Sequence, residues 1–257
     1  MKMSGAKMVI ESLHQEGVEV VFGYPGGAIM NVYDEIYKQN YFEHILNRHE
    51  QACVIAAEGY ARSTGKTGVA IVTSGPGFTN AITGIADAYM DSIPVVIISG
   101  QVPTTIIGTD GFQEIDAVGI SRPCTKHNYL VNKIEDLPRI IKEAFHLAST
   151  GRPGPVHVDI PKDITAQLGE FIYPSEVNMP TYKPTLNYNK KQLKRAMEAI
   201  SNAKKPLLYI GGGAILSNCG YEIRDLAKKL NIPAVEALMA RGVMGDEKTL
   251  CFGMLGM

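Results

Sequence analysis

The residue with the clearest chemical potential in this sequence is Glu50, which stands between a short apolar stretch and a run of small residues. The stretch reads LNRHEQACVIAAEGYARSTGK from Leu46 to Lys66, and the neighbouring groups able to pair with this carboxyl are Arg48 and His49. Acidic side chains are common in the first turn of a helix, because the exposed amide groups there carry partial positive charge. On residue statistics alone, Glu50 is therefore a solvent-exposed helix-start glutamate.

Four glycine-containing turns form the second group of residues that could do chemistry. They read GYPGGA, TSGPGFTN, SGQVP and IGGGA, at residues 23–28, 73–80, 99–103 and 210–214. Turns at the carboxyl ends of parallel strands surround the crevice where open α/β sheets bind ligands, and glycine lets a flat ligand approach the backbone closely. Each turn alone is also explained by strand-to-helix geometry. None is a G-x-x-x-x-G-K-[ST] or G-x-G-x-x-G motif, so a nucleotide triphosphatase or a Rossmann dehydrogenase is not supported.

These turns require strands, and apolar runs do alternate with helical patterns through the first 163 residues. The runs are VEVVFG, HILN, GVAIVTSG, IPVVIISG and PVHVDIP, each followed or preceded by a segment with helical spacing. Nearly unbroken apolar strands separated by helices are typical of a parallel sheet that is covered on both faces. The sequence therefore predicts the α/β class, with a first parallel-sheet domain over residues 1–163.

The alternation stops between residues 164 and 189, which we interpret as a linker. This segment contains prolines and scattered polar residues without a period. A second α/β series starts at residue 190 with the helical pattern KKQLKRAMEAI and continues with the strands PLLYIGGG and IPAVEAL. Two clear strands are too few to close a sheet, so we expect residues 190–257 to be the start of a truncated domain.

Composition and charge exclude several classes of partner. The chain has 25 basic and 26 acidic side chains and a net charge of -1, which gives no footprint for nucleic acid or for an anionic membrane. The N-terminus has helical spacing rather than the apolar run of a signal peptide, and no stretch is long enough to span a bilayer. The four cysteines are far apart, as in a cytoplasmic protein with reduced thiols. We predict no metal ligand in this chain.

Several longer motifs occur in a fixed order along the chain. They are VFGYPGGAIMNVYD, RHEQACVIAAEGYARSTGKTGVAIVTSGPGFTN, GIADAYMDSIPVVIISGQV, IGTDGFQEID, TKHNYLV and GRPGPVHVDIPKD. Together they resemble the N-terminal half of the large subunit in the acetolactate synthase (acetohydroxyacid synthase) family of thiamine diphosphate enzymes. The resemblance extends from Val18 to Met257 and includes GGGA and GMLGM. The chain departs from the family at Phe78 and Gly111, where alanine is usual, and at EALMARG.

The resemblance implies a domain organisation and a reaction. Residues 1–163 would be the pyrimidine-binding domain for thiamine diphosphate, and residues 190–257 would begin a central FAD-binding-type domain. The reaction would be decarboxylation of pyruvate and condensation with a second 2-keto acid, a step of isoleucine and valine biosynthesis. Magnesium would be held by a C-terminal domain that the chain lacks, so we expect the isolated fragment to be inactive.

The resemblance also assigns roles to residues of the first domain. Glu50 would hydrogen-bond the pyrimidine N1′ and favour the imino form of the cofactor, a role that suits a carboxyl in an apolar pocket because desolvation favours proton sharing. Gly27 would lie near the activated cofactor, while Phe112 and Gln113 would line the substrate site. Lys162 would attract a keto-acid carboxylate at the edge of the site, although a solvated loop lysine is an equally good interpretation.

A flavin site is the other implication of the resemblance. Glycine amides can approach a diphosphate closely, and a guanidinium can pair with phosphate oxygens. The positions that match FAD-contacting residues of the family are Arg152, Gly211, Gly212, Gly213, Leu238 and Met239.

The resemblance leaves alternatives open for function and implies several partners. An oxalyl-CoA decarboxylase, a sulfoacetaldehyde acetyltransferase or a glyoxylate carboligase would share the glycine turns, and their products would differ. A non-catalytic binding or assembly module is a second alternative. The complete large subunit would form a homodimer or tetramer, with a regulatory small subunit as a further partner.

Overall fold

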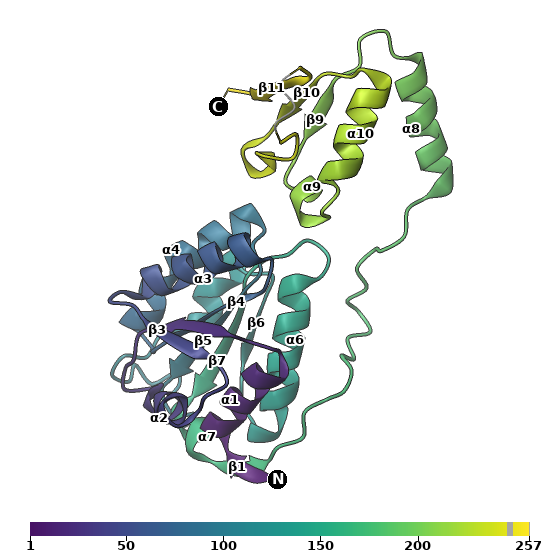
Figure 1. The fold of residues 1–257 in the computed structure, drawn as a ribbon. Coiled ribbons are helices and arrows are strands. Elements are labelled where there is room, and N and C mark those ends of the chain that lie inside the picture. The colour runs from purple at the N-terminus through teal and green to yellow at the C-terminus, as the bar shows by residue number, and fades with distance from the viewer. Residues whose placement is uncertain (246–248, 257) are drawn as a thin grey trace. The chain divides into compact units, whose positions relative to one another are not determined.

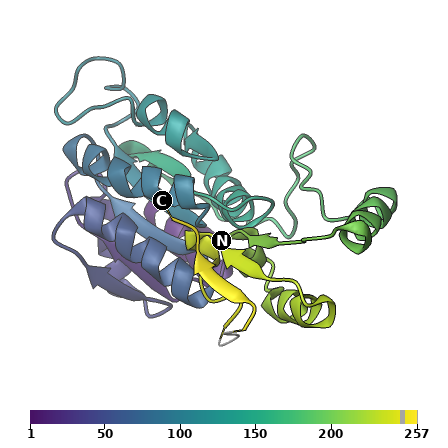
Figure 2. The ribbon, with the colours of Figure 1, turned by 90° about the horizontal axis from the view of Figure 1, so that it is seen from above.

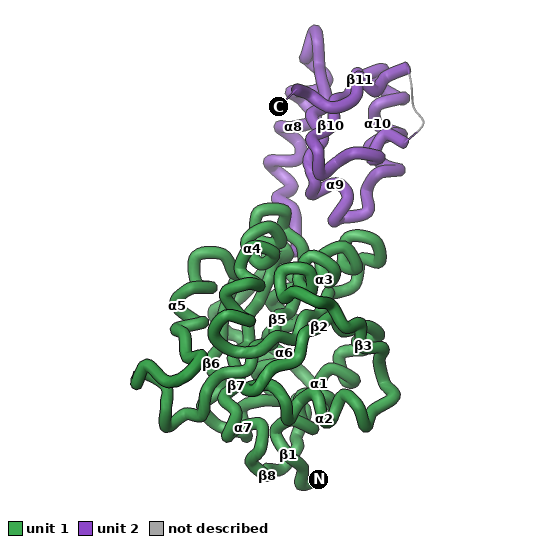
Figure 3. Tube along the Cα trace, turned by 90° about the vertical axis from the view of Figure 1, so that its left-hand side faces the viewer, with its two compact units in different colours: residues 1–185 green, residues 186–257 purple. Residues whose placement is uncertain are grey.

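The chain divides into two compact units in a computed structural model that describes residues 1–245 and 249–256. The first unit comprises Met1–Thr185 and the second Leu186–Met257 (Figure 3). Each unit has a parallel sheet with helices, so the predicted α/β class is confirmed (Figure 1). Among the described residues, no helix is long and apolar enough to cross a membrane.

The first unit is built on a six-stranded parallel sheet with the strand order β3-β2-β4-β5-β7-β6. All residues of β4, β5 and β7 are buried, which explains why these strands read as unbroken apolar runs. The strands are β2 (Val20–Gly23), β3 (Glu43–Leu46), β4 (Gly68–Val72), β5 (Val95–Gln101), β6 (His127–Leu130) and β7 (Val156–Pro161).

Helices cover both faces of this sheet (Figures 1 and 2). Helices α1, α2 and α6 contribute to one large apolar core with the strands, while α3 and α4 pack together on the other face. The helices and short 3-10 turns are α1 (Gly5–Gln15), α2 (Met30–Lys38), α3 (Glu50–Thr64), α4 (Pro76–Asp91), α5 (Ala117–Ser121), η1 (Arg122–Cys124), η2 (Ile134–Asp136) and α6 (Leu137–Ser149).

The structure corrects the linker expected over residues 164–189. Helix α7 (Lys162–Ala166) and strand β8 (Leu168–Glu170) belong to the first unit, and β8 pairs antiparallel with β1 (Lys2–Ser4). Further along, Phe171, Met179 and Tyr182 pack against the main core. These anchors are spaced irregularly, so no period marked them in the sequence. The boundary between the two compact units falls after Thr185.

The second unit contains a three-stranded parallel sheet with the order β11-β10-β9. Strand β11 was not expected, because CFGM is short, contains glycine and lacks β-branched residues. A small core of buried residues, including Ile210 and Ala234, holds the sheet to its helices. The elements are α8 (Lys190–Asn202), β9 (Leu208–Ile210), α9 (Gly213–Leu216), α10 (Gly220–Leu230), β10 (Ala234–Glu236), η3 (Leu238–Ala240) and β11 (Cys251–Met254).

The contact between α3 and α4 depends on a glycine. A Cβ on Gly84 of α4 would lie 2.8 Å from Cβ of Val54 in α3, closer than side-chain carbons approach one another. Gly59 of α3 is also in the middle of a helix, but a Cβ there would meet no atom within 4 Å. The two glycines therefore separate the effect of close packing from the effect of backbone freedom.

We predict that Gly84→Ala lowers the free energy of unfolding by about 1–3 kcal/mol, because the added methyl group overpacks the α3–α4 contact. The matched variant Gly59→Ala should raise it by about 0.4–1 kcal/mol, since alanine restricts the unfolded chain without a clash. Urea unfolding followed by circular dichroism measures both. Equal shifts for the two variants would contradict the packing explanation.

Candidate functional site

Glu50 is the first residue of α3, and it is buried rather than solvated. Glu50 is only 6% exposed to solvent, so the interpretation of it as an exposed helix-start glutamate is wrong. The preceding residue, His49, caps the helix through Nδ1, which accepts from the Gln51 amide at 3.2 Å. The partner of the carboxyl comes from α4, where Asn80 Nδ2 donates to Glu50 Oε2 at 3.0 Å. Sequence reasoning missed Asn80, although it stands in the TSGPGFTN turn motif.

The turns that follow β2 and β4 pack against each other beside Glu50. The Ala28 amide donates to Thr73 Oγ1 at 3.3 Å, and a Cβ on Gly26 would lie 2.5 Å from the Thr73 side chain. A Cβ on Gly77 would meet the same threonine at 2.6 Å and Glu50 Oε1 at 3.2 Å. These close approaches require glycine at both positions. Two of the predicted turns thus meet at one buried carboxyl.

Gly27 is the open position in this arrangement. It is exposed, and a Cβ added there would meet no atom within 4 Å. The backbone at Gly27 is therefore accessible to a bound molecule, while Gly26 beside it is closed by Thr73. A ligand that reaches the Glu50 carboxyl has free backbone to lie against at this edge of the sheet.

The charge of Glu50 acts on two neighbouring side chains. Burial, followed by the nearby Glu50 carboxylate, raises the pKa of the Cys53 thiol to about 12. Burial also raises the pKa of the Tyr33 hydroxyl, with further contributions from Cys53 and Glu50. Cys53 is thus a protonated thiol at neutral pH and no nucleophile. Among the described residues, no lysine or arginine forms an ion pair with Glu50, and the hydrogen bond to its carboxyl comes from the neutral amide of Asn80.

The loop that carries Phe112 and Gln113 reaches the same region. Both side chains are exposed, Phe112 by 89%. Gln113 has a φ of 59°, and its backbone lies against Gly75, the residue that precedes α4, where a Cβ would be 2.6 Å from the Gln113 oxygen. The structure therefore brings these two residues to the turn between β4 and α4, close to Gly77 and Glu50.

Lys162 and Arg152 lie at different places in the first unit. Lys162 is exposed and begins α7 directly after β7, at the carboxyl edge of the sheet. Arg152 donates from Nε to Ser92 Oγ at 2.7 Å and from Nη2 to the Met90 carbonyl at 3.4 Å. Because Met90 and Ser92 end α4, Arg152 lies at the opposite edge of the sheet from Glu50. The structure therefore does not bring Lys162 and Arg152 together.

The remaining flavin candidates gather in the second unit. The turn after β9 packs against η3, since a Cβ on Gly212 would lie 2.9 Å from Cβ of Met239. Leu238, the first residue of η3, is 69% exposed. Gly211 and Gly213 line a cavity of about 310 Å³ with apolar neighbours from β9 and α10. The glycine turn thus forms one side of an apolar pocket.

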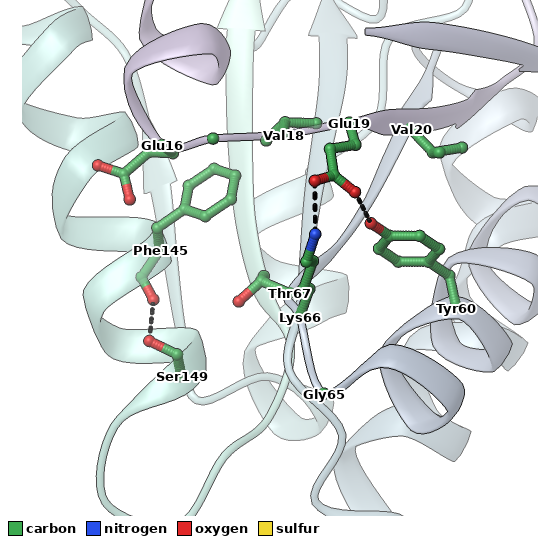
Figure 4. Close-up of a pocket in the computed structure, with 11 residues that line it drawn as sticks. Glu16, Val18, Glu19, Val20, Tyr60, Gly65, Lys66, Thr67, Phe145 and Ser149 are labelled. Atoms are coloured by element: carbon green, nitrogen blue, oxygen red, sulfur yellow. Dashed lines mark hydrogen bonds and ion pairs between the residues drawn. The ribbon is translucent and has the colours of Figure 1, made fainter.

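A larger cavity, of about 390 Å³, lies at the amino edge of the six-stranded sheet (Figure 4). Glu19 is one of its lining residues, and it pairs with Lys66 Nζ at 2.5 Å and accepts from the Tyr60 hydroxyl at 3.4 Å. The residues that line this cavity include Glu16, directly after α1, and Ser149 of α6. Because the opposite ends of the strands carry Glu50 and the glycine turns, this cavity is remote from the candidate site.

Polar side chains in the central strands form a buried network that the sequence analysis did not identify. Ser99 Oγ lies 2.6 Å from His157 Nε2 and donates to Asp159 Oδ1 at 2.6 Å. Gln101 Nε2 donates to Asp159 Oδ2 at 2.9 Å, and Phe78 stacks on His157 with ring centroids 4.2 Å apart. The sequence did contain a signal for this network, because polar residues alternate with apolar ones in the strand segments IISGQ and VHVDIP. Because the serine lies between the histidine and the aspartate, the trio does not have the order of a catalytic triad.

Burial shifts both titratable members of this network. Desolvation raises the pKa of Asp159 to about 7, and it lowers the pKa of His157 to about 3. The histidine is therefore neutral in the folded chain at neutral pH. Phe78, one of the departures from the family pattern, is accommodated by its stacking on this neutral ring.

Comparison with known proteins gives the class of the chain. The family model described as the N-terminal TPP binding domain of thiamine pyrophosphate enzymes matches residues 3–120, and the model of their central domain matches residues 193–257. The chain belongs to the thiamine pyrophosphate enzyme family. Within that family, it is homologous to the N-terminal part of acetolactate synthase large subunits, at about 50% identity.

Three relatives illustrate the similarity. The acetolactate synthase large subunit of Haemophilus influenzae is 54% identical over 258 residues, and the isozyme 3 large subunit of Escherichia coli is 52% identical over 257. An acetolactate synthase of Mycobacterium leprae is 50% identical over 256 residues. The matches cover 99–100% of this chain. The chain spans 45%, 45% and 41% of the length of these relatives.

We predict that Asp159→Asn changes how stability depends on pH. Because burial raises the folded pKa of Asp159 to about 7, above the unfolded value, the stability that its proton supplies is present in acid and is lost as pH rises towards 7. Asparagine has no such proton. The free energy of unfolding of the variant should therefore increase relative to the wild type between about pH 4.5 and pH 7.5.

Urea unfolding at several pH values measures this difference. His157 has the opposite pH dependence, because its lowered pKa makes the folded state bind fewer protons, but it is present in both proteins. Its contribution therefore cancels in the comparison. A difference that stays constant across this pH range would contradict the assignment of a raised pKa to Asp159.

Proposed function

We propose that this chain is the N-terminal part of a thiamine diphosphate-dependent acetolactate synthase. The observation that carries the proposal is the buried Glu50 carboxyl, held by Asn80 at the start of α3 beside the open backbone of Gly27. A buried carboxylate without a cationic partner is costly, and a ligand that shares a proton with it removes that cost. The family match and the homology to acetolactate synthase large subunits supply the identity of that ligand.

The residues of the candidate site fit thiamine diphosphate. When bound, this cofactor supplies the carbon nucleophile and the electron sink for decarboxylation and carbon–carbon bond formation. Glu50 would hold or release the proton at the pyrimidine N1′, and Asn80 would keep the carboxyl in place. The backbone at Gly27 would lie against the cofactor. Glu50 is buried, which would limit the access of water to this proton exchange.

The substrates we propose are pyruvate and a second 2-keto acid. Phe112 and Gln113 are exposed on a loop beside the turn that carries Gly75, which suits contact with a small substrate next to the cofactor. Lys162 is exposed at the same edge of the sheet, where its charge would attract a keto-acid carboxylate. Isoleucine and valine biosynthesis is the proposed context.

Further partners are proposed from the relatives, which are more than twice as long as this chain. FAD would bind with Gly211, Gly212, Gly213, Leu238 and Met239, because the glycine turn and its apolar cavity suit a flat ring system. Magnesium and the cofactor diphosphate would be held by sequence that corresponds to the remaining length of the relatives. A homodimer or tetramer, a regulatory small subunit and a cytoplasmic location complete the proposal.

Replacing the Glu50 carboxyl by an amide tests the proposal directly. The assay uses a chimera of residues 1–257 followed by the C-terminal remainder of the Haemophilus influenzae relative, supplied with pyruvate, thiamine diphosphate, magnesium and FAD. We predict that the chimera forms acetolactate and that Glu50→Gln lowers its turnover by about 10² or more, the scale of losing a general acid/base. The amide has nearly the same shape, so a large loss reflects proton chemistry.

A matched control is Glu176→Gln, which changes an exposed glutamate distant in sequence from the site. It should leave turnover within twofold, roughly the scatter for surface changes. Near-normal acetolactate formation by Glu50→Gln would refute the catalytic assignment. A chimera that consumes pyruvate without forming acetolactate would instead favour one of the related carboligases or decarboxylases.

We also predict that residues 1–257 alone bind thiamine diphosphate weakly and form no acetolactate. The chain contains the proposed proton-exchanging carboxyl, but contacts to a magnesium-bridged diphosphate would supply much of the orientation of the cofactor. Isothermal titration with magnesium and thiamine diphosphate, together with a pyruvate-consumption assay, measures both properties. Tight binding or turnover by the isolated chain would show that no additional segment is needed.

A further inference from the structure

The loop between β5 and α5 has an unusual backbone. It covers residues 102–116 and carries Phe112 and Gln113 on its exposed side. Asp110 and Gln113 have φ angles of 57° and 59°, although neither is glycine, and Gly108 has a φ of 84°. Each non-glycine residue in the left-handed region costs on the order of 1 kcal/mol, so other interactions must hold this conformation.

The carboxylate of Glu114 supplies such interactions. Its Oε1 accepts from the Gly108 amide, and its Oε2 accepts from the amides of Gly111 at 2.9 Å and Thr109 at 3.3 Å. The Glu114 amide in turn donates to the Gly111 carbonyl at 2.9 Å. Backbone amides that converge in a turn with left-handed residues form a concave site for an anion. Here the anion is a side chain of the same loop.

The effect of these bonds on Glu114 has the expected direction. The amides of Gly108 and Gly111 hold the pKa of its carboxyl below the usual range, with smaller contributions from Thr109 and Asp110. The other carboxyl groups that line the cavity beneath the loop with Glu114 are Asp116 and Asp159. A negative charge on Asp116 would raise the pKa of Glu114, and Asp159, whose own pKa is raised to about 7, is uncharged in the acid range where Glu114 titrates. Neither group therefore explains a lowered value.

Separate contacts fix the two ends of the loop. At its start, Asp163 accepts from the Thr104 amide at 3.0 Å and from Thr104 Oγ1 at 2.5 Å. At its end, Gln101 Nε2 donates to the Ile115 carbonyl at 2.9 Å and also to Asp159. The ends are thus attached to the sheet without Glu114. What Glu114 adds is the shape of the turn between residues 108 and 113.

We propose that Glu114 is a positioning residue, whose carboxylate gathers the amides of residues 108–111 and thereby sets the conformation in which Phe112 and Gln113 are presented to the substrate. The conformational part of this proposal concerns the chain alone, and the substrate part rests on the proposed function. Gln113 shows why conformation matters, because its left-handed backbone is what fits against Gly75, the residue that precedes α4.

The conformational part is tested by nuclear magnetic resonance on residues 1–257. The amide protons of Gly108, Thr109 and Gly111 should shift together as pH is lowered, with one midpoint below the ordinary range of a glutamate side chain. The amide protons should shift as pH falls through the lowered pKa of Glu114, because the hydrogen bonds exist while its carboxylate is charged and are lost when it is protonated. In Glu114→Gln this common titration should vanish and the three amides should exchange with solvent about tenfold faster.

Glu135→Gln is the matched control, because Glu135 is exposed in η2 and remote in sequence from the loop. It should leave both the titration and the exchange rates unchanged. Unaltered circular dichroism would show that Glu114→Gln folds, and the wild-type titration needs no variant. Amides that fail to titrate together in the wild type, or that keep their exchange rates in Glu114→Gln, would overturn the proposal.

The substrate part is tested in the chimera described above. If Glu114 presents Phe112 and Gln113 for substrate binding, Glu114→Gln should raise KM for pyruvate by about tenfold and change kcat much less. An unchanged KM would overturn the substrate part. Failure of the proposed function gives a different result, because the unmutated chimera would then form no acetolactate while the amide titration would remain.

Discussion

The burial of one carboxyl at the start of α3 is the constraint on which the rest of the candidate site depends. Removing a carboxylate from water is unfavourable unless polar groups replace its hydration. Here the positive end of α3 and the amide of Asn80 offset part of this cost. Asn80 belongs to α4, so this arrangement requires α3 and α4 to pack closely. Gly84 permits the close packing, because it has no side chain where Val54 of α3 lies. The environment of Glu50 is thus a consequence of helix packing.

The parallel sheet brings the remaining site residues to the same edge. The turns after β2 and β4 meet at Thr73, which closes Gly26 and leaves Gly27 accessible. The loop after β5 reaches this edge in a strained conformation that the amides around Glu114 stabilise. A rigid sheet with strained connections is a common way to hold reacting groups, because the strands fix the ends of each loop while the loop supplies side-chain variety.

The buried network around Asp159 shows that polar groups in the central strands also have a structural role. Ser99, Gln101 and Asp159 satisfy one another inside the sheet, and Gln101 extends the network to the loop after β5 through the Ile115 carbonyl. Fully hydrogen-bonded polar groups in a core fix a single arrangement, because any shift leaves a group unpaired. The network therefore connects the interior of the sheet to the loop that carries Phe112 and Gln113.

Sequence alone determined the α/β class and the strand-to-helix turns, because apolar periodicity and glycine placement are local properties of the chain. The family followed from the resemblance of several motifs in a fixed order. It did not determine that Glu50 is buried or that Asn80 contacts it, since that contact joins residues 30 positions apart. Irregularly spaced anchors such as Tyr182 likewise made an ordered segment read as linker. Only the tertiary structure decided these points. The burial of a side chain and the identity of its hydrogen-bond partner depend on which distant segments pack together, and no local sequence pattern encodes this packing.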